Sequence, residues 1–198
     1  MPITADQVKQ LRDRTGAGMM ECKKALAESE GDVERAVDAL RKSGAVKAAT
    51  RSSRDAREGM VEAYIHPGNR VGVLIEVNCE TDFVARTPEF QELVRSLAMQ
   101  VAAAGAEYIR PEDVPAERVA RERDVFLGQL EGTGKPAAIL EKIVDGKLEK
   151  FYGELCLMNQ VYIRDDKKTI ADLVREAGSK TGENIVVRRF SRFRLGQD

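Results

Sequence analysis

Apolar residues recur at helical spacing through the first part of the chain, and this pattern predicts three short helices. A capping box, T-x-x-Q, begins at Thr4, ahead of the first helix. The segment TGAG at 15–18 interrupts the pattern before the second helix. The third helix is expected to begin after Asp32 as its N-cap and to stop at Gly44. Three short helices with few apolar residues each predict a small bundle over residues 1–45.

This bundle, with a glycine-containing loop after its first helix, resembles a ubiquitin-associated domain. Met19 and Met20 are adjacent at the start of the second helix, so they cannot both face so small a core. An exposed methionine is either a tolerated surface residue or part of a partner-binding surface. The position beside the glycine loop, at the edge of the domain, favours partner binding.

Residues 46–58 are predicted to be a basic, partly helical linker. The segment has few large apolar residues, and its basic charges are most simply a solvated face. A nucleic-acid patch is the weaker interpretation, because no aromatic residue is interleaved for base stacking. The basic residues concerned are Lys47, Arg51, Arg54 and Arg57.

Residues 59–198 alternate between strand-like and helix-like patterns, which predicts an α+β core domain. Two runs of alternating apolar and polar residues flank the turn-forming tripeptide PGN at 67–69, as in a β-hairpin. A third strand-like run, ENIVVRRFSRFRL, follows at 183–195. Helical patterns lie between them, so we expect a three-stranded antiparallel sheet with helices packed on it.

The clearest helix of the core is predicted to begin at Thr87-Pro88, an N-cap followed by proline in the first turn. Two more helices are expected, from Pro115 to Leu130 and from Pro136 to about Val144. The buried stripe of the helix that begins at Thr87-Pro88 is expected to consist of Phe90, Leu93, Leu97 and Val101.

Both faces of the predicted sheet carry apolar residues. One face is expected to join the odd-numbered apolar residues of the second strand to those of the first, Val61, Ala63 and Ile65. A sheet face open to water is usually more polar than the opposite face is here. We therefore predict a homodimer in which a second copy covers that opposite face. The predicted dimer interface consists of Met60, Tyr64, Leu74 and Phe190.

The composition is that of a soluble globular protein, since 42% of the 198 residues are hydrophobic and 33% are charged. A net charge of −1 gives no general attraction to nucleic acid or to anionic membranes. Three widely separated cysteines without a C-x-x-C argue against a disulfide framework or a zinc site and are typical of a reducing cytosol. No signal peptide or membrane-spanning segment is expected, so the sequence predicts a cytoplasmic protein.

Motifs for catalysis are weak or absent. His66 is the single histidine, and a structural role beside the predicted turn is its simpler interpretation. The segment GTGKP at 132–136 lacks the glycine spacing of a phosphate-binding loop, and Pro136 stands where that loop needs Ser or Thr. The sequence therefore predicts no enzyme activity, no cofactor, no metal site and no direct nucleotide binding.

Three segments together carry a family resemblance: LRDRTGAGMMECKKAL at 11–26, NCETDFVAR at 78–86 and ENIVVRRFSRF at 183–193. They resemble the elongation factor Ts family, and the similarity extends over the whole chain. The resemblance implies a guanine-nucleotide exchange factor that binds elongation factor Tu, GDP-bound or nucleotide-free, and promotes GDP release. The chain has length for one core module, as in the short form of the family, which implies a homodimer that supplies the second module.

The resemblance also implies which residues contact the partner. In the family, a T-D-F-V segment lies against the nucleotide-binding domain of elongation factor Tu and disturbs its magnesium site. The matching residues are Thr81, Asp82, Phe83 and Val84. The N-terminal domain grips the same partner domain elsewhere, and the residues expected there are Leu11, Met19 and Met20.

Phe83 separates the two lines of reasoning. In an arbitrary protein, Phe83 would be expected to pack beneath the next helix beside Phe90, while Asp82 caps a helical turn. The family resemblance predicts instead an exposed ring that contacts the partner.

Two other functions fit parts of the sequence. The first 45 residues would suit a ubiquitin-associated-type protein-binding adaptor, although this leaves the T-D-F-V segment unexplained. An RNA-binding module would use the linker and the last strand, and it would show steep salt dependence. The net charge of −1 argues against RNA binding, and no membrane or DNA partner is predicted. The arginines of that strand are Arg188, Arg189, Arg192 and Arg194.

Overall fold

The computed structural model describes residues 3–15, 17–133 and 136–197, with the backbone alone described for residues 45–49. The chain separates into two compact units, and the strands of one sheet run through both. Each unit is therefore made of segments that are far apart in the sequence. The first combines Met1–Glu62, Ile75–Arg95 and Asp172–Arg188, and the second combines Ala63–Leu74, Ser96–Ala171 and Arg189–Asp198.

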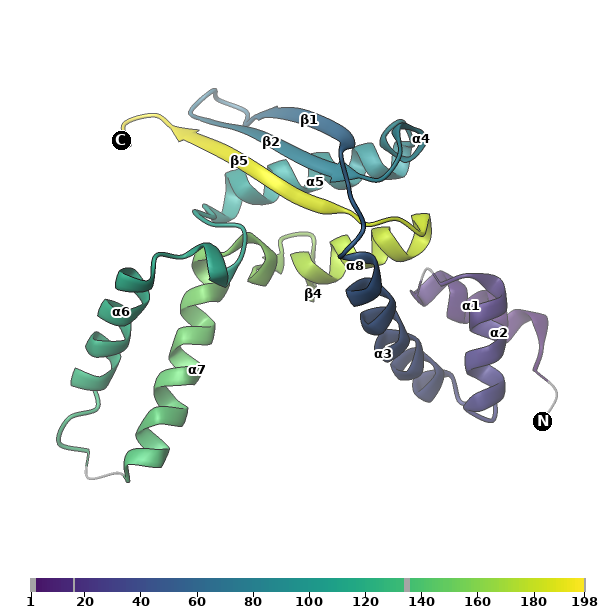
Figure 1. Ribbon diagram of the computed structural model, residues 1–198, viewed down its shortest axis with the longest axis horizontal. Helices are drawn as coiled ribbons and strands as arrows, with labels where there is room; N and C mark the ends of the chain where they lie inside the picture. The colour runs from purple at the N-terminus through teal and green to yellow at the C-terminus, as the bar shows by residue number, and fades with distance from the viewer. Residues whose placement is uncertain (1–2, 16, 134–135, 198) are drawn as a thin grey trace. The chain divides into compact units, whose positions relative to one another are not determined.

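The N-terminal bundle consists of α1 (Ala5–Thr15), α2 (Met19–Glu28) and α3 (Val33–Arg51) (Figure 1). The capping box is present, because the Thr4 N–H donates to Gln7 Oε1 at 2.9 Å and the Gln7 N–H donates to Thr4 Oγ1 at 3.3 Å. The bundle predicted from helical spacing is confirmed. Its small core contains Leu11, Cys22, Ala25, Leu26, Ala36 and Val37.

Helix α3 is longer than predicted, since its helical backbone continues beyond Gly44 to Arg51. A glycine inside a helix costs only about 1 kcal/mol relative to alanine, and the alanine-rich sequence that follows favours helix again. Within the linker, Arg51 Nη2 donates to Ser179 Oγ at 3.3 Å and Arg54 Nη1 donates to Gly182 O at 3.3 Å. Arg51 and Arg54 are therefore not simply solvated, as the sequence suggested for the basic linker residues.

A three-stranded antiparallel sheet has the strand order β1-β2-β5 (Figure 1). Strands β1 (Glu58–Ile65) and β2 (Val71–Cys79) form the predicted hairpin, and β5 (Val186–Arg194) pairs with β2. The His66 N–H donates to Val71 O at 2.9 Å and closes the hairpin turn. The predicted α+β fold is confirmed.

Helix α5 (Pro88–Ala104) covers one face of this sheet (Figure 1). Glu62 of β1 forms an ion pair with Arg95 of α5 at 3.8 Å, and Arg192 Nη2 of β5 donates to Ala102 O at 3.4 Å. The apolar stripe predicted for this helix is buried, as are the β2 residues that face it. These buried side chains are Phe90, Leu93, Leu97 and Val101 of α5 and Val73, Ile75 and Val77 of β2.

The hairpin register places β1 differently from the sequence expectation. Pairing of His66 with Val71 sets odd-numbered residues of β1 opposite even-numbered residues of β2, and opposite residues share a face. A Cβ atom at Gly72 would accordingly lie 3.1 Å from Ile65 Cδ1. Turn length sets this register, and a shift by one residue exchanges the two faces of a strand. The expected valine face was therefore wrong for Val61, Ala63 and Ile65.

The four residues predicted for the dimer interface are thereby divided between two faces. Because Glu62 contacts α5, strand alternation also places Met60 and Tyr64 on the α5 side. Phe190 lies on that side too, two residues before the arginine that bonds α5. Leu74 lies on the opposite side and is 50% exposed. We call this side the open face, and its exposed large apolar residues are Val61, Ile65, Leu74 and Phe193.

Helices α6 (Ala116–Gly128) and α7 (Ala137–Leu155) form a helical hairpin (Figure 1), in which Arg123 Nη1 lies 3.1 Å from Asp145 Oδ1. Helix α7 continues well past its predicted end near Val144, because Gly146 and Gly153 are tolerated inside it. In the part of the chain that is described, no helix is long and apolar enough to cross a membrane. The shorter elements are α4 (Asp82–Ala85), η1 (Pro111–Asp113), η2 (Leu157–Asn159), β3 (Val161–Tyr162), β4 (Asp165–Thr169) and α8 (Ile170–Thr181).

Candidate partner-binding loop

The TDFV loop (Thr81–Val84) is separated from the end of β2 by Glu80 alone, and it forms most of α4, a single helical turn. Thr81 is the N-cap of this turn, because its Oγ1 accepts a hydrogen bond from the Val84 N–H at 3.4 Å. Thr87 Oγ1 donates to Val84 O at 2.8 Å and accepts an N–H at the start of α5. Hydrogen bonds therefore fix the backbone of the loop at both ends.

Phe83 is 78% exposed, whereas Phe90 of α5 is 1% exposed. The interpretation in which Phe83 packs beneath α5 is therefore wrong. Asp82 is half-buried and forms an ion pair with Arg86 at 2.7 Å, one helical turn later. The TDFV loop thus presents an aromatic ring beside a carboxylate at the surface.

Cys79, the last residue of β2, supports the TDFV loop from the buried side. Its thiol is fully buried and donates a hydrogen bond to Thr81 O at 3.2 Å. Burial, and next the nearby Glu183 carboxylate, raise the pKa of the Cys79 thiol to about 11. The thiol therefore keeps its proton at neutral pH and remains a donor to the loop.

Sequence reasoning missed Glu183, which lies between α8 and β5. Its carboxylate accepts hydrogen bonds from the backbone N–H groups of Glu80 and Thr81 at 3.0 and 3.1 Å. The two partners are more than 100 positions away in the sequence. An acidic residue between a helix and a strand carries no local signal for such a contact, which only the folded chain creates.

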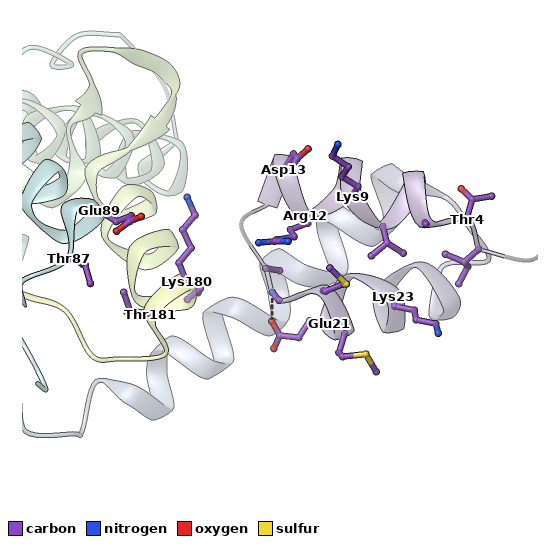
Figure 2. A pocket seen from close by; sticks show the side chains of 18 of the residues that line it. Thr4, Lys9, Arg12, Asp13, Glu21, Lys23, Thr87, Glu89, Lys180 and Thr181 are labelled. Atoms are coloured by element: carbon purple, nitrogen blue, oxygen red, sulfur yellow. Dashed lines mark hydrogen bonds between the residues drawn. The ribbon is translucent and has the colours of Figure 1, made fainter. Parts of the chain in front are cut away.

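The bundle residues expected to contact a partner differ in exposure. Met19 and Met20 are 59% and 75% exposed at the start of α2, whereas Leu11 is fully buried in the bundle core. Leu11 can therefore support this surface but does not form it. The methionines line a surface pocket that also carries basic side chains, seen close by in Figure 2: Lys9, Arg12 and Lys23.

The backbone before the two methionines is held in place by a hydrogen bond to the Glu21 side chain. The Gly18 N–H donates to Glu21 Oε2 at 3.3 Å, the dashed line in Figure 2. Gly18 is the N-cap residue of α2, and Glu21 occupies the third position of that helix. The flexible methionine side chains therefore project from a fixed turn, an arrangement that suits protein recognition.

Within residues 3–15, 17–133 and 136–197, no group of three or more His, Cys, Asp and Glu residues could hold a metal ion. His66 Nδ1 lies 3.1 Å from the Tyr64 hydroxyl beside the hairpin turn, a contact that fits a structural role. The segment GTGKP, considered above as a phosphate loop, lies partly outside the described residues, at Gly134 and Lys135.

Comparison with known proteins gives matches along almost the entire chain. A family model described as "Elongation factor TS" matches residues 5–197. The protein named Elongation factor Ts from Caldanaerobacter subterraneus subsp. tengcongensis is 55% identical over 195 residues, 98% of each chain. That from Herpetosiphon aurantiacus is 54% identical over 198 residues, 100% of each chain. The chain belongs to the elongation factor Ts family.

Membership of the elongation factor Ts family confirms the resemblance seen in the three sequence segments. It places the chain among the proteins of translation elongation. Because the matches run from the first helix to the last strand, the bundle, the sheet and the TDFV loop all belong to the region shared with the family.

Proposed function

We propose that this chain is the guanine-nucleotide exchange factor for elongation factor Tu. It binds the GDP-bound form, promotes GDP release and lets GTP bind in its place. The observation that carries the proposal is the TDFV loop, in which Phe83 is 78% exposed on a turn fixed by hydrogen bonds. An aromatic side chain on a fixed backbone loses little entropy on binding and is well suited to be an interface hot spot.

The loop acts on the nucleotide-binding domain of its partner. The Phe83 ring inserts between partner helices, while the Asp82 carboxylate meets polar groups near the magnesium and phosphate site. Thr81 and Val84 complete the contact. Displacement of the magnesium ion weakens GDP binding without any covalent change, so the chain acts as an exchange factor rather than an enzyme and needs no nucleotide site of its own.

Thermodynamic linkage makes partner binding and GDP release two sides of one equilibrium. If the factor binds nucleotide-free elongation factor Tu more tightly than the GDP-bound form, bound factor lowers GDP affinity by the same ratio. Each tenfold in that ratio corresponds to about 1.4 kcal/mol. The interface must therefore discriminate between the two partner states, which a loop directed at the magnesium site can do.

The bundle supplies a second contact through Met19 and Met20, which are exposed at a pocket lined by both basic and acidic side chains. In this proposal the bundle (residues 1–45) and the core (residues 59–198), joined by the linker, bind different places on the same partner domain. Two linked contacts raise the effective concentration of each for its site. The bundle then holds the partner while the TDFV loop acts on its nucleotide site.

The chain also forms a homodimer in this proposal, through the open face of the sheet. Val61, Ile65, Leu74 and Phe193 are each at least half exposed there. Exposed large apolar side chains are costly in water when they gather on one face, and a second copy of the same face could cover them. The factor acts in the cytoplasm, where translation elongation takes place.

The test is the release of labelled GDP from elongation factor Tu, followed with and without this chain. We expect a small molar fraction of the chain to accelerate release of all the bound GDP, because each factor molecule is freed when GTP binds. A release rate that does not change at any concentration of the chain would contradict the proposal.

The alternative functions have weaker support. An RNA-binding module would use basic side chains of β5 to neutralise phosphate groups. Arg192 is used within the fold, in its hydrogen bond to Ala102 O. A ubiquitin-associated-type adaptor would account for the bundle but not for the exposed Phe83.

A further inference from the structure

We propose that Glu183 is a positioning residue of the exchange reaction. It holds the TDFV loop in the orientation that presents Asp82 and Phe83 to elongation factor Tu. The inference rests on the proposed function, but it concerns a residue outside the TDFV loop, in the connection between α8 and β5. Glu183 acts on the backbone that precedes the two contact residues.

The Glu183 carboxylate binds three donors at the start of the loop. Oε2 accepts the N–H groups of Glu80 and Thr81 at 3.0 and 3.1 Å, and Oε1 accepts the Thr81 hydroxyl at 2.5 Å. Hydrogen bonds to an ionised acceptor are about twice as strong as neutral ones. Because the Thr81 hydroxyl donates to Glu183, its lone pairs are free to accept the Val84 N–H, which makes Thr81 an N-cap.

Glu80 and Asn184 connect the same two segments, with the donor and acceptor roles of the segments exchanged. Glu80 Oε1 accepts the Asn184 N–H at 2.6 Å and lies 3.4 Å from Arg54 Nη1. The Asn184 side chain, which is buried, donates to Arg54 O at 2.8 Å. Glu80 and Glu183 therefore form a reciprocal clamp between the end of β2 and the start of β5.

Phe83 needs such a clamp because little of its ring packs against other residues. At 78% exposure, the direction of the ring is set by the backbone of α4 rather than by packing around it. An interface residue that is already oriented before binding avoids part of the ordering cost. Loss of Glu183 would leave two adjacent N–H groups and the Thr81 hydroxyl without their acceptor and let the loop reorient.

The experiment compares Glu183→Ala and Glu183→Gln with wild type in the full chain. Amide hydrogen exchange measures how well the N–H groups of Glu80 and Thr81 are protected. The rate of GDP release, measured at varied concentrations of GDP-bound elongation factor Tu, gives kcat and the KM for that complex. We expect Glu183→Ala to lower kcat about tenfold. KM should change less, because the bundle still binds the partner. Glu183→Gln keeps one acceptor oxygen and the fold, so it should fall between the other two in both readouts.

The control is Asp113→Ala, which removes a carboxylate that accepts the Arg110 N–H at 2.9 Å at another turn. It should leave kcat unchanged. In a Phe83→Ala background, Glu183→Ala should lower kcat by clearly less than the tenfold expected in the wild-type background, since one of the two contact residues that it positions is gone. A full additional loss, or kcat values that do not follow amide protection across the three chains, would overturn the proposal. If wild type does not accelerate GDP release from elongation factor Tu, the proposed function fails, while amide exchange still tests the clamp.

Discussion

Phe83 and Phe90 have the same side chain and lie only seven positions apart, yet one is 78% exposed and the other 1%. Phe90 belongs to the apolar stripe of α5, where helical spacing repeats the contact with the sheet. Phe83 lies on a single helical turn, which has no room for a second apolar position on the same face. Periodicity therefore explains Phe90 and cannot explain Phe83.

In the proposed function, the same side chain serves the fold at Phe90 and partner binding at Phe83. A buried ring is held by its neighbours and contributes to the stability of the fold. An exposed ring must be held through its backbone, and the TDFV loop has such support in the Thr81 cap, the Cys79 thiol and Glu183. Substitution at the two positions should consequently separate stability from exchange.

The sharpest test replaces each phenylalanine by alanine. Phe83→Ala should cut stimulation of GDP release more than tenfold, as expected for an interface hot spot of about 2 kcal/mol or more, and leave the melting temperature nearly unchanged. Phe90→Ala should lower the free energy of unfolding by about 3–5 kcal/mol, because it creates a cavity in the core. Exchange assays on both variants measure the stimulation of GDP release, and urea titrations measure the free energy of unfolding.

The opposite pattern would contradict the roles assigned to Phe83 and Phe90. If Phe83→Ala lost several kcal/mol of stability and retained exchange per folded molecule, the exposed ring would serve the fold after all. Phe90→Ala should retain most exchange activity at a temperature where it remains folded. Loss of exchange in this folded variant would mean that the core and the TDFV loop are more tightly coupled than their different exposure suggests.

Much of the fold could be predicted from the sequence because its signals are local. The T-x-x-Q capping box and the start of α5 at Thr87-Pro88 each depend on a few neighbouring residues. The buried stripe that begins at Phe90 depends on spacing within one helix. The TDFV loop was found through family resemblance, since four residues in a turn carry no periodic signal.

The remaining features depend on contacts between distant segments or on small energies. The side on which Val61 lies depends on the hairpin register, which the turn sets and strand alternation alone does not reveal. The end of α3 was missed because glycine lowers helix stability by only about 1 kcal/mol. Glu183 was missed because its contact with the TDFV loop exists only after α8 and β5 fold against β2.

The open face offers a second contrast between exposed and buried apolar residues. Leu74 is 50% exposed, while its β2 neighbours Val73 and Ile75 are buried against α5. If a second copy covers the open face, Leu74→Glu should place a charge in the interface and convert the dimer to single chains. Light scattering at micromolar concentration should then report half the wild-type mass.

The matched control for this prediction is Leu127→Glu, at a leucine that is 37% exposed on α6. It should leave the mass at that of wild type. A wild-type mass equal to one chain would contradict the homodimer directly. A dimer that persists in Leu74→Glu would place the interface elsewhere than on the open face.

A smaller effect is expected at the methionine pair. Met20 is 75% exposed, so Met20→Ala should weaken binding to elongation factor Tu several-fold with little change in stability. Met60 is half-buried on the α5 side, so Met60→Ala should lower stability and leave affinity unchanged. Titration calorimetry with the nucleotide-free partner measures both affinities. Equal affinity of wild type and Met20→Ala would remove Met20 from the interface.

The smallest effect concerns the buried support beneath Phe83. The pKa of Cys79 is raised from 9.0 to about 11, so between these values the folded chain keeps a proton that the unfolded chain releases. The stability that this thiol contributes is therefore complete below about pH 9 and is lost as the pH rises toward 11. Between pH 8 and pH 10, wild type should lose about 1 kcal/mol more unfolding free energy than Cys79→Ala. Urea titrations at both pH values measure this difference.

Cys156, whose pKa is also raised to about 11, is present in both chains and cancels from the comparison. Identical pH dependence of the two chains would show that the Cys79 thiol is not the protonated, buried support from which the exposed loop projects.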